Sequence, residues 1–308
     1  MINRELIRIK VVQLVYAYYM NEGKAMDVAE KELMTSLSKA YQLYNLLLDL
    51  IVAVTNEERL RYEMQAVKAQ REGVEYVTPK FAYNRFAVQL EENEQLAEYN
   101  EVNKLSWKDD TEFVRKICNL MEQSETYQQY ITSEDDSYDA DREVWRKLYK
   151  QVIENNDELA LLLEDKSLYW NDDKDIVDSF IIKTIKRFDP ANKSKQELLP
   201  EFKGDFDKEY AIKLFRSAIL NGKDYQGYME QYSRNWKLNR MPFMDIVIMQ
   251  VALAELMVFP TIPVSVTLNE YVEIAKAYST PRSAPFINGM LDALARGLIE
   301  DGKLMKQM

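Results

Sequence analysis

Apolar residues recur every three or four positions along most of this sequence, a pattern that predicts amphipathic α-helices. From Pro242 to Val258 apolar side chains cover most of a helix surface, and only Asp245, Gln250 and Glu255 are polar. Such a helix belongs in a protein core. Two further apolar helical segments follow it, ending near residue 298, and helices are also predicted over residues 3–20, 26–37, 38–70, 79–99, 107–130, 144–163, 172–188 and 207–218.

The first predicted helix, residues 3–20, carries an apolar face and leaves Arg4, Arg8 and Lys10 on its solvent side. Asn3 is a suitable N-cap, because its side chain can accept a hydrogen bond from the first turn. Three cations on one helix are typical of a solvated edge. They also allow contact with nucleic acid.

Composition supports an all-α protein, since the 308 residues include only 8 Gly and 8 Pro and are rich in helix-forming residues. This length suits one large domain or two ordinary ones. No uncharged apolar run approaches the roughly 18 residues that span a bilayer, and the amphipathic N-terminus is unlike a signal peptide. We therefore expect a cytoplasmic protein without membrane contact. The single cysteine, Cys118, lies among apolar residues and is expected to be a small core side chain.

Several classes of catalytic site are excluded, because the sequence contains no histidine, no Gly-rich phosphate loop and no paired CxxC motif. We therefore expect a binding protein rather than an enzyme, with no cofactor and no metal. The acidic run over residues 132–143 lacks the glycine turn and final glutamate of an EF-hand. This run favours a solvated acidic linker over a cation site. Residues 191–200 are also expected to form an exposed linker.

The net charge of -11 is unevenly distributed along the chain. Residues 1–20 carry +2 and residues 205–300 carry -1, whereas residues 21–204 carry -13. The acidic middle segment is therefore unsuited to binding phosphates over most of its surface.

Two parts of the sequence share an order and spacing with one known family. The first is RELIRIKVVQLVYAYYM, with a Gln-x-x-Tyr turn from Gln13 to Tyr16. The second runs from WKLNR (Trp236–Arg240) through ALAELM and IPVSVTLNEYVEIAKAYST to PFINGMLDALAR, which ends at Arg296. Together they resemble the NusB family of bacterial transcription antitermination factors, and the Phe-Ile-Asn-Gly element is the most diagnostic part.

The resemblance implies an all-α, non-enzymatic fold of two small helical bundles. Residues 1–38 and 205–300 would form this NusB-like, two-subdomain helical bundle, and residues 301–308 a tail. Residues 39–204 have no counterpart in compact family members and are expected to be an acidic helical insertion. This insertion either docks a basic partner, shields the chain from non-specific nucleic acid, or is simply a solvated bundle.

The resemblance also implies an RNA-binding transcription antitermination factor. Family members pair with a small-subunit ribosomal protein, NusE, and bind single-stranded boxA RNA in ribosomal RNA transcripts, which helps the elongating RNA polymerase complex resist termination. Single-stranded RNA is bound by aromatic stacking on bases and by cations at phosphates. By match to the family, the RNA-binding residues would be Arg4, Arg8, Tyr16, Arg282, Phe286 and Asn288.

Several of these residues also have a structural explanation. Tyr16 and Phe286 suit core packing, and Asn288-Gly289 could allow two helices to approach closely. Lys276 could pair with Glu273 or Asp292. The alternative function is a helical protein-interaction scaffold of the ribosomal RNA transcription or ribosome assembly machinery that no longer binds RNA.

Overall fold

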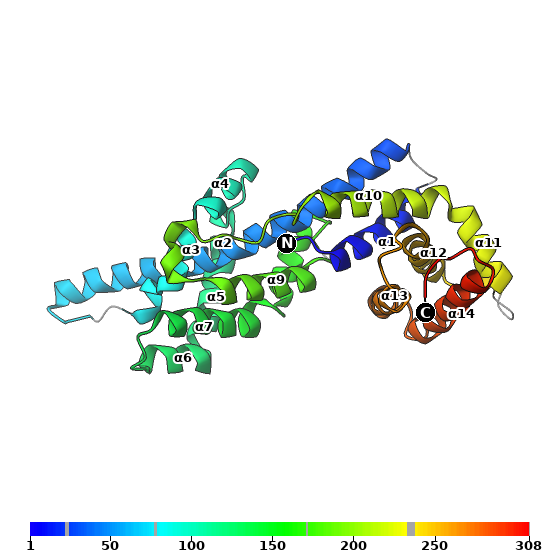
Figure 1. Ribbon diagram of the computed structural model, residues 1–308. Helices are drawn as coiled ribbons and strands as arrows, with labels where there is room; N and C mark the ends of the chain where they lie inside the picture. Colours follow the sequence, from blue (N-terminus) through cyan, green and yellow to red (C-terminus); the bar gives the residue numbers. More distant parts are fainter. Residues whose placement is uncertain (22–24, 77–78, 171, 233–237, 308) are drawn as a thin grey trace. The chain divides into compact units, whose positions relative to one another are not determined.

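The computed structural model describes residues 1–21, 25–76, 79–170, 172–232 and 238–307. In these residues the regular elements are helices, and one isolated bridge joins Ile2 to Phe202. The prediction of an all-α fold is therefore confirmed. The chain forms two compact units (Figure 1): unit 1 comprises Met1 and Ser38–Glu201, and unit 2 comprises Ile2–Leu37 and Phe202–Met308. Whether residues 39–204 are an insertion into a family domain stays a prediction.

Unit 2 is organised around α12, which contacts α1, α10, α11, α13 and α14 (Figure 1). Residues 26–37 of α2 (Met26–Glu72) also belong to this unit. Its remaining helices are α1 (Arg4–Met20), α10 (Asp205–Leu220), α11 (Gly222–Tyr232), η5 (Leu238–Arg240), α12 (Phe243–Val258), α13 (Val264–Tyr278) and α14 (Ser283–Glu300).

The composition of α12 explains its central position. Every residue over 247–256 is buried, as its apolar sequence predicted. The three polar residues, Asp245, Gln250 and Glu255, are buried as well, and each forms side-chain hydrogen bonds to neighbouring helices. Buried polar groups need such partners, since leaving one unpaired costs ~1–3 kcal/mol. Phe243 departs from the expected core, because it is 37% exposed at the start of the helix.

Unit 1 is more finely divided than the sequence pattern suggested. Residues 26–37 and 38–70, predicted as separate segments, lie in the single helix α2. The helix predicted over residues 79–99 is broken, because Asn84 and Asn93 accept hydrogen bonds from Ala87 and Leu96 and so begin new helices. The other helices are η1 (Lys80–Tyr83), α3 (Arg85–Glu91), α4 (Glu94–Asn103), η2 (Lys108–Asp110), α5 (Thr111–Glu122), α6 (Glu125–Thr132), α7 (Tyr138–Leu148), η3 (Tyr149–Ile153), α8 (Asp157–Lys166), α9 (Lys174–Arg187) and η4 (Pro190–Lys195).

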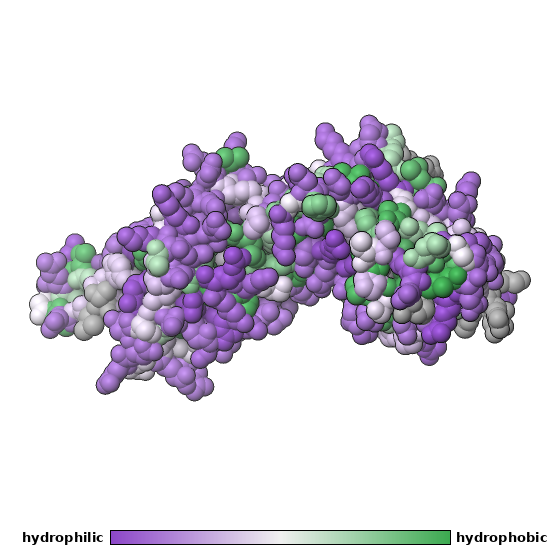
Figure 2. All heavy atoms as spheres, in the orientation of Figure 1, coloured by the Kyte–Doolittle hydropathy of each residue, from purple (hydrophilic) through white to green (hydrophobic). Residues whose placement is uncertain are grey.

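Two segments expected to be solvated linkers are partly built into unit 1. In the acidic run, Asp141 is buried and accepts hydrogen bonds from Tyr130 (2.6 Å) and Arg85 (2.7 Å). In the segment 191–200, Gln196 and two leucines are buried. Both expectations were therefore wrong for these residues. Elsewhere the face of unit 1 seen in Figure 2 is largely hydrophilic.

Candidate nucleic-acid interface

Arg8 does not lie on the solvent side of α1, contrary to the expectation from the helical pattern. Its side chain is 4% exposed, and that of Glu255 is 0% exposed. Arg8 donates to both carboxylate oxygens of Glu255, at 2.7 Å from Nε and 3.1 Å from Nη2, and to Glu270 at 3.0 Å. Lys10 is buried too. The guanidinium of Arg8 is therefore committed to the core of unit 2.

The Glu255 carboxylate is the centre of a buried hydrogen-bond network. Besides Arg8 it accepts from Thr267 (2.7 Å), from Tyr271 (3.4 Å) and from Tyr210. Burial and the nearby Glu255 charge raise the pKa of the Tyr210 phenol, so this phenol remains a donor. Because α1, α10, α12 and α13 each contribute a member, the network fixes the first helix against the C-terminal helices.

Arg4 remains exposed at the start of α1. Its guanidinium carbon lies 5.1 Å from the ring centroid of Tyr210, a cation–π geometry that orients the side chain without removing it from solvent. Of the two arginines predicted on this helix, Arg4 alone is therefore accessible to a phosphate.

Tyr16 lies at the opposite end of α1 and is half-buried. Its ring packs against Phe243, with 5.4 Å between ring centroids, and Tyr19 meets the same ring edge-on at 6.0 Å. Tyr16 is thus neither wholly core nor freely exposed. With the exposed Phe243 it forms an aromatic edge at the N-terminal end of α12.

The C-terminal motif presents its polar residues to solvent. Arg282, the N-cap residue of α14, is exposed. On the helix itself, Asn288 is exposed and Phe286 is half-buried. A Cβ added to Gly289 would meet nothing within 4 Å, so this glycine is not required for a close approach to another helix. Lys276 pairs with Glu273 at 2.5 Å, one of the two partners expected for it.

The turn that carries Arg282 is held in place by a buried carboxylate. Asp245, in the first turn of α12, accepts hydrogen bonds from Ser283 (2.8 Å) and Ser279, and Thr280 lies 2.8 Å from the Ser283 hydroxyl. These contacts join the end of α13 to the start of α14. The arrangement fixes the backbone on which Arg282 and Phe286 are presented.

The structure therefore brings together only part of the predicted site. Tyr16 and Arg282 are both tied to the N-terminal end of α12, through Phe243 and Asp245 respectively. Arg4 lies about 18 Å from Tyr16 along α1, given a rise of ~1.5 Å per residue. A ligand that contacts all the exposed residues must be extended.

Sequence reasoning missed Phe243 and Asp245, although one signal was present. Asp245 interrupts an otherwise apolar helix in its first turn, where a carboxylate is usually explained by the helix dipole alone. Its serine partners lie more than thirty positions away. Local pattern therefore could not reveal the network.

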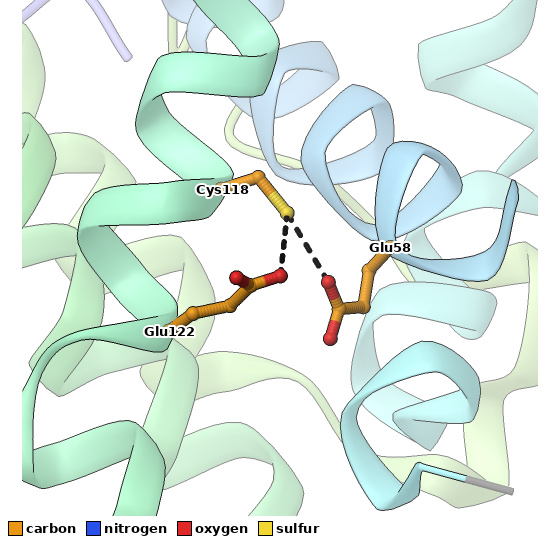
Figure 3. Close-up of side chains that lie close together, drawn as sticks. All are labelled: Glu58, Cys118 and Glu122. Carbon is orange, nitrogen blue, oxygen red and sulfur yellow. Dashed lines mark hydrogen bonds between the residues drawn. The ribbon is translucent and has the colours of Figure 1, made fainter. Parts of the chain in front are cut away.

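A second cluster of polar groups lies inside unit 1, where Glu58, Cys118 and Glu122 point toward one another (Figure 3). Their ligand atoms lie within 4.8 Å, as a metal site would require. Hydrogen bonds already link them, since Cys118 lies 3.2 Å from Glu58, and Arg61 donates to Glu122 at 2.9 Å. Burial and the Glu58 carboxylate raise the pKa of the Cys118 thiol, which keeps it protonated. The cluster is explained by internal hydrogen bonding.

In the described part of the chain, none of the helices combines the length and apolar character needed to cross a membrane. Trp236 and Lys237 of the WKLNR motif lie outside the described residues. Unit 2 is an all-helical module that exposes arginine and aromatic side chains at the start of α1, at the start of α12 and at the start of α14.

Comparisons with known proteins identify the family of this chain. The model of the NusB family matches residues 175–296. A transcription antitermination protein NusB from a Thermoanaerobacter species is 37% identical over 121 residues, which are 38% of this chain and 86% of that protein. The chain belongs to the NusB family.

Two other NusB proteins are also similar to parts of this chain. The NusB protein of Chloroherpeton thalassium is 38% identical over 99 residues, which cover 32% of this chain and 47% of that protein. A solved structure of T. maritima NusB is 28% identical, covers 45% of this chain and 84% of that chain, and has a TM-score of 0.29. The first of these matches therefore spans about half the length of its relative.

Proposed function

We propose that this chain is a non-enzymatic, cytoplasmic transcription antitermination factor that binds single-stranded boxA-type RNA together with a NusE-like ribosomal protein, within the elongating RNA polymerase complex. Membership of the NusB family supports this role. The observation that carries it is the presentation of Arg282 at the N-cap of α14, and of Phe286 and Asn288 on that helix, whose first turn is fixed by Asp245.

The chemistry of these residues suits an unpaired strand. A guanidinium can contact phosphate or stack on a base, an aromatic ring offers a stacking surface, and an amide can read a base edge. Asn288 is solvent-exposed, and no side-chain hydrogen bond to it occurs among the described residues. Its amide therefore has both donor and acceptor capacity for a ligand.

The RNA face we propose comprises Arg4, Tyr16, Arg282, Phe286 and Asn288. Arg8 is assigned to the core instead, because its donors are taken by Glu255 and Glu270. Arg8 therefore affects RNA binding only indirectly, because it holds α1 in place.

The proposal is tested by gel shift with a boxA-type RNA, with and without the NusE-like ribosomal protein. We expect the wild-type chain to shift the RNA, more tightly with the partner. Arg282→Ala with Asn288→Ala should weaken binding about tenfold or more, as expected for loss of one phosphate contact and one base contact.

The matched control is Arg296→Ala, which removes an equal charge from α14 at an exposed residue paired with Asp292. This variant should bind RNA nearly as the wild type does. No shift at low salt, with or without the partner, would refute the proposed function.

A second function, a protein-interaction scaffold that does not bind RNA, is favoured by one observation. Three cations of α1 were predicted to face solvent, but Arg8 and Lys10 are buried and Arg4 alone of the three is exposed. This function predicts binding to the ribosomal protein with no gain in RNA affinity.

A further inference from the structure

Unit 1 contains an open pocket of about 740 Å³ between α2, α4 and the segment that follows η4. It is formed by Tyr41, Gln95, Glu98, Tyr99, Val102, Asn103, Glu197, Leu198, Pro200 and Glu201. Three of these residues are carboxylates and none is a lysine or arginine. The pocket belongs to the acidic segment, for which the NusB-like function supplies no role.

The walls of the pocket are fixed by hydrogen bonds. Gln95 accepts from the Leu198 amide at 2.9 Å, and Tyr41 donates to the Leu199 carbonyl at 3.1 Å. Ser38 donates to the Glu201 carboxylate at 2.6 Å. These contacts hold the segment 197–201 beside α4 and α2. The pocket walls are therefore fixed by hydrogen bonds within unit 1.

Two tyrosine rings contribute to the pocket lining. Tyr41 and Tyr99 meet edge-to-face, with their centroids 5.0 Å apart. Burial raises the pKa of the Tyr99 phenol, and the Glu201 charge raises it further. The negative charge of Glu201 therefore acts close to the Tyr99 ring. It adds to the attraction of the ring face for cations.

The carboxylates of the pocket are not neutralised by neighbouring side chains. Among the described residues, Glu98, Glu197 and Glu201 form no ion pair with a lysine or arginine. The amino group of Met1 donates to the backbone oxygen of Glu201 at 3.3 Å, and Met1 is not part of the pocket lining. The same amino group donates to the backbone oxygen of Pro200, so it is a cation beside the pocket, while no lysine or arginine of the described residues pairs with the three carboxylates.

The surroundings extend the same chemistry beyond the pocket. Residues 38–201 contain 22 Lys and Arg against 34 Asp and Glu, a net charge of -12. On α4, Glu94, Glu98 and Glu101 follow at helical spacing, which places them along one side of the helix. Val102, 74% exposed, adds an apolar contact at the rim. Nucleic acid is repelled by such a surface, whereas a basic polypeptide is attracted.

We propose that this pocket binds an arginine side chain of a basic protein segment, whose further cations lie along the acidic side of α4. A guanidinium can pair with carboxylates and stack on tyrosine at the same time, which an ammonium does less well. This interaction is independent of the RNA face in unit 2, so its test does not depend on the proposed RNA function.

The test measures how tightly the full chain binds a fluorescent eight-residue peptide of alternating arginine and serine. Binding is measured by fluorescence anisotropy at low salt. Glu98→Gln with Glu201→Gln should weaken binding about tenfold, because it removes two charges at the site. Glutamine at position 201 can still accept the hydrogen bond from Ser38. Tyr99→Leu should also weaken binding.

The matched control is Glu63→Gln with Glu134→Gln, which removes the same charge at exposed residues of unit 1 outside the pocket. We expect little change in this variant. Equal weakening in both double variants would show that net charge alone attracts the peptide and would overturn the proposal. So would equal binding of a citrulline peptide, or spermidine binding as tight as that of the arginine peptide.

Discussion

Arg8 provides the sharpest test of the reassigned first helix. The Arg8→Ala substitution would leave the Glu255 carboxylate, which is 0% exposed, without its cationic partner. Removing one partner of a buried pair costs ~3–5 kcal/mol, because an uncompensated charge remains in the core. The contact to Glu270 adds little, since that carboxylate is 35% exposed and its pairing is screened by solvent.

A loss of this size is large for a single domain, whose total stability is typically about 5–15 kcal/mol. Urea denaturation followed by circular dichroism should show the lowered midpoint. The double variant Arg8→Met with Glu255→Gln should recover part of the loss, because neither remaining side chain carries a charge.

The control is Arg4→Ala, which removes an exposed arginine from the same helix and should change stability by less than ~1 kcal/mol. Equal stability of the Arg8→Ala and Arg4→Ala variants would refute a structural role for Arg8.

Further predictions concern buried groups. Burial raises the pKa of Asp49 from 3.8 to about 6, so the fold loses stability as the pH rises from about 3.8 to about 6 and stays destabilised above that range. Asp49→Asn should therefore stabilise the chain by about 1–2 kcal/mol at pH 8 and by little at pH 4, unlike the exposed control Asp109→Asn. Gly222→Ala should lower stability by ~1–2 kcal/mol, because the added Cβ would lie 2.8 Å from the Gln250 amide. Gly227→Ala, where the added Cβ would meet open space, should raise stability by about 0.5–1 kcal/mol. Thermal melts would distinguish the two variants. Cys118 should react with iodoacetamide far more slowly in the native protein than in urea, because burial raises its pKa; comparable rates would contradict this.

Much of the fold follows from local patterns. The apolar period of α12 predicted a buried helix, and residues 247–256 are all buried. The breaks in unit 1 were harder to place, since asparagine caps at Asn84 and Asn93 act within a sequence that otherwise continues its helical period. Such a helix boundary depends on a single hydrogen bond accepted by the asparagine side chain. The apolar pattern does not indicate where that hydrogen bond forms.

The candidate site shows where sequence reasoning ends. Arg4 and Arg8 look equivalent on a helical wheel, yet Arg8 is buried because Glu255, a carboxylate 247 positions away, provides its counter-charge. Glu255 itself looked like a polar exception on a core helix. Predicting that Arg8 pairs with Glu255 requires knowledge of how α1 packs on α12, which is tertiary information.

The salt dependence of boxA-type RNA binding tests the proposed RNA face most directly. Each phosphate contact to a single strand contributes about 0.7 to the slope of log affinity against log salt concentration. With the NusE-like partner present, Arg4→Ala with Arg282→Ala should reduce the slope by about 1.4. The control, Lys213→Ala with Arg296→Ala, removes equal charge at exposed ion-paired residues of unit 2 and should leave the slope unchanged. Identical slopes for the two double variants would contradict the proposed face.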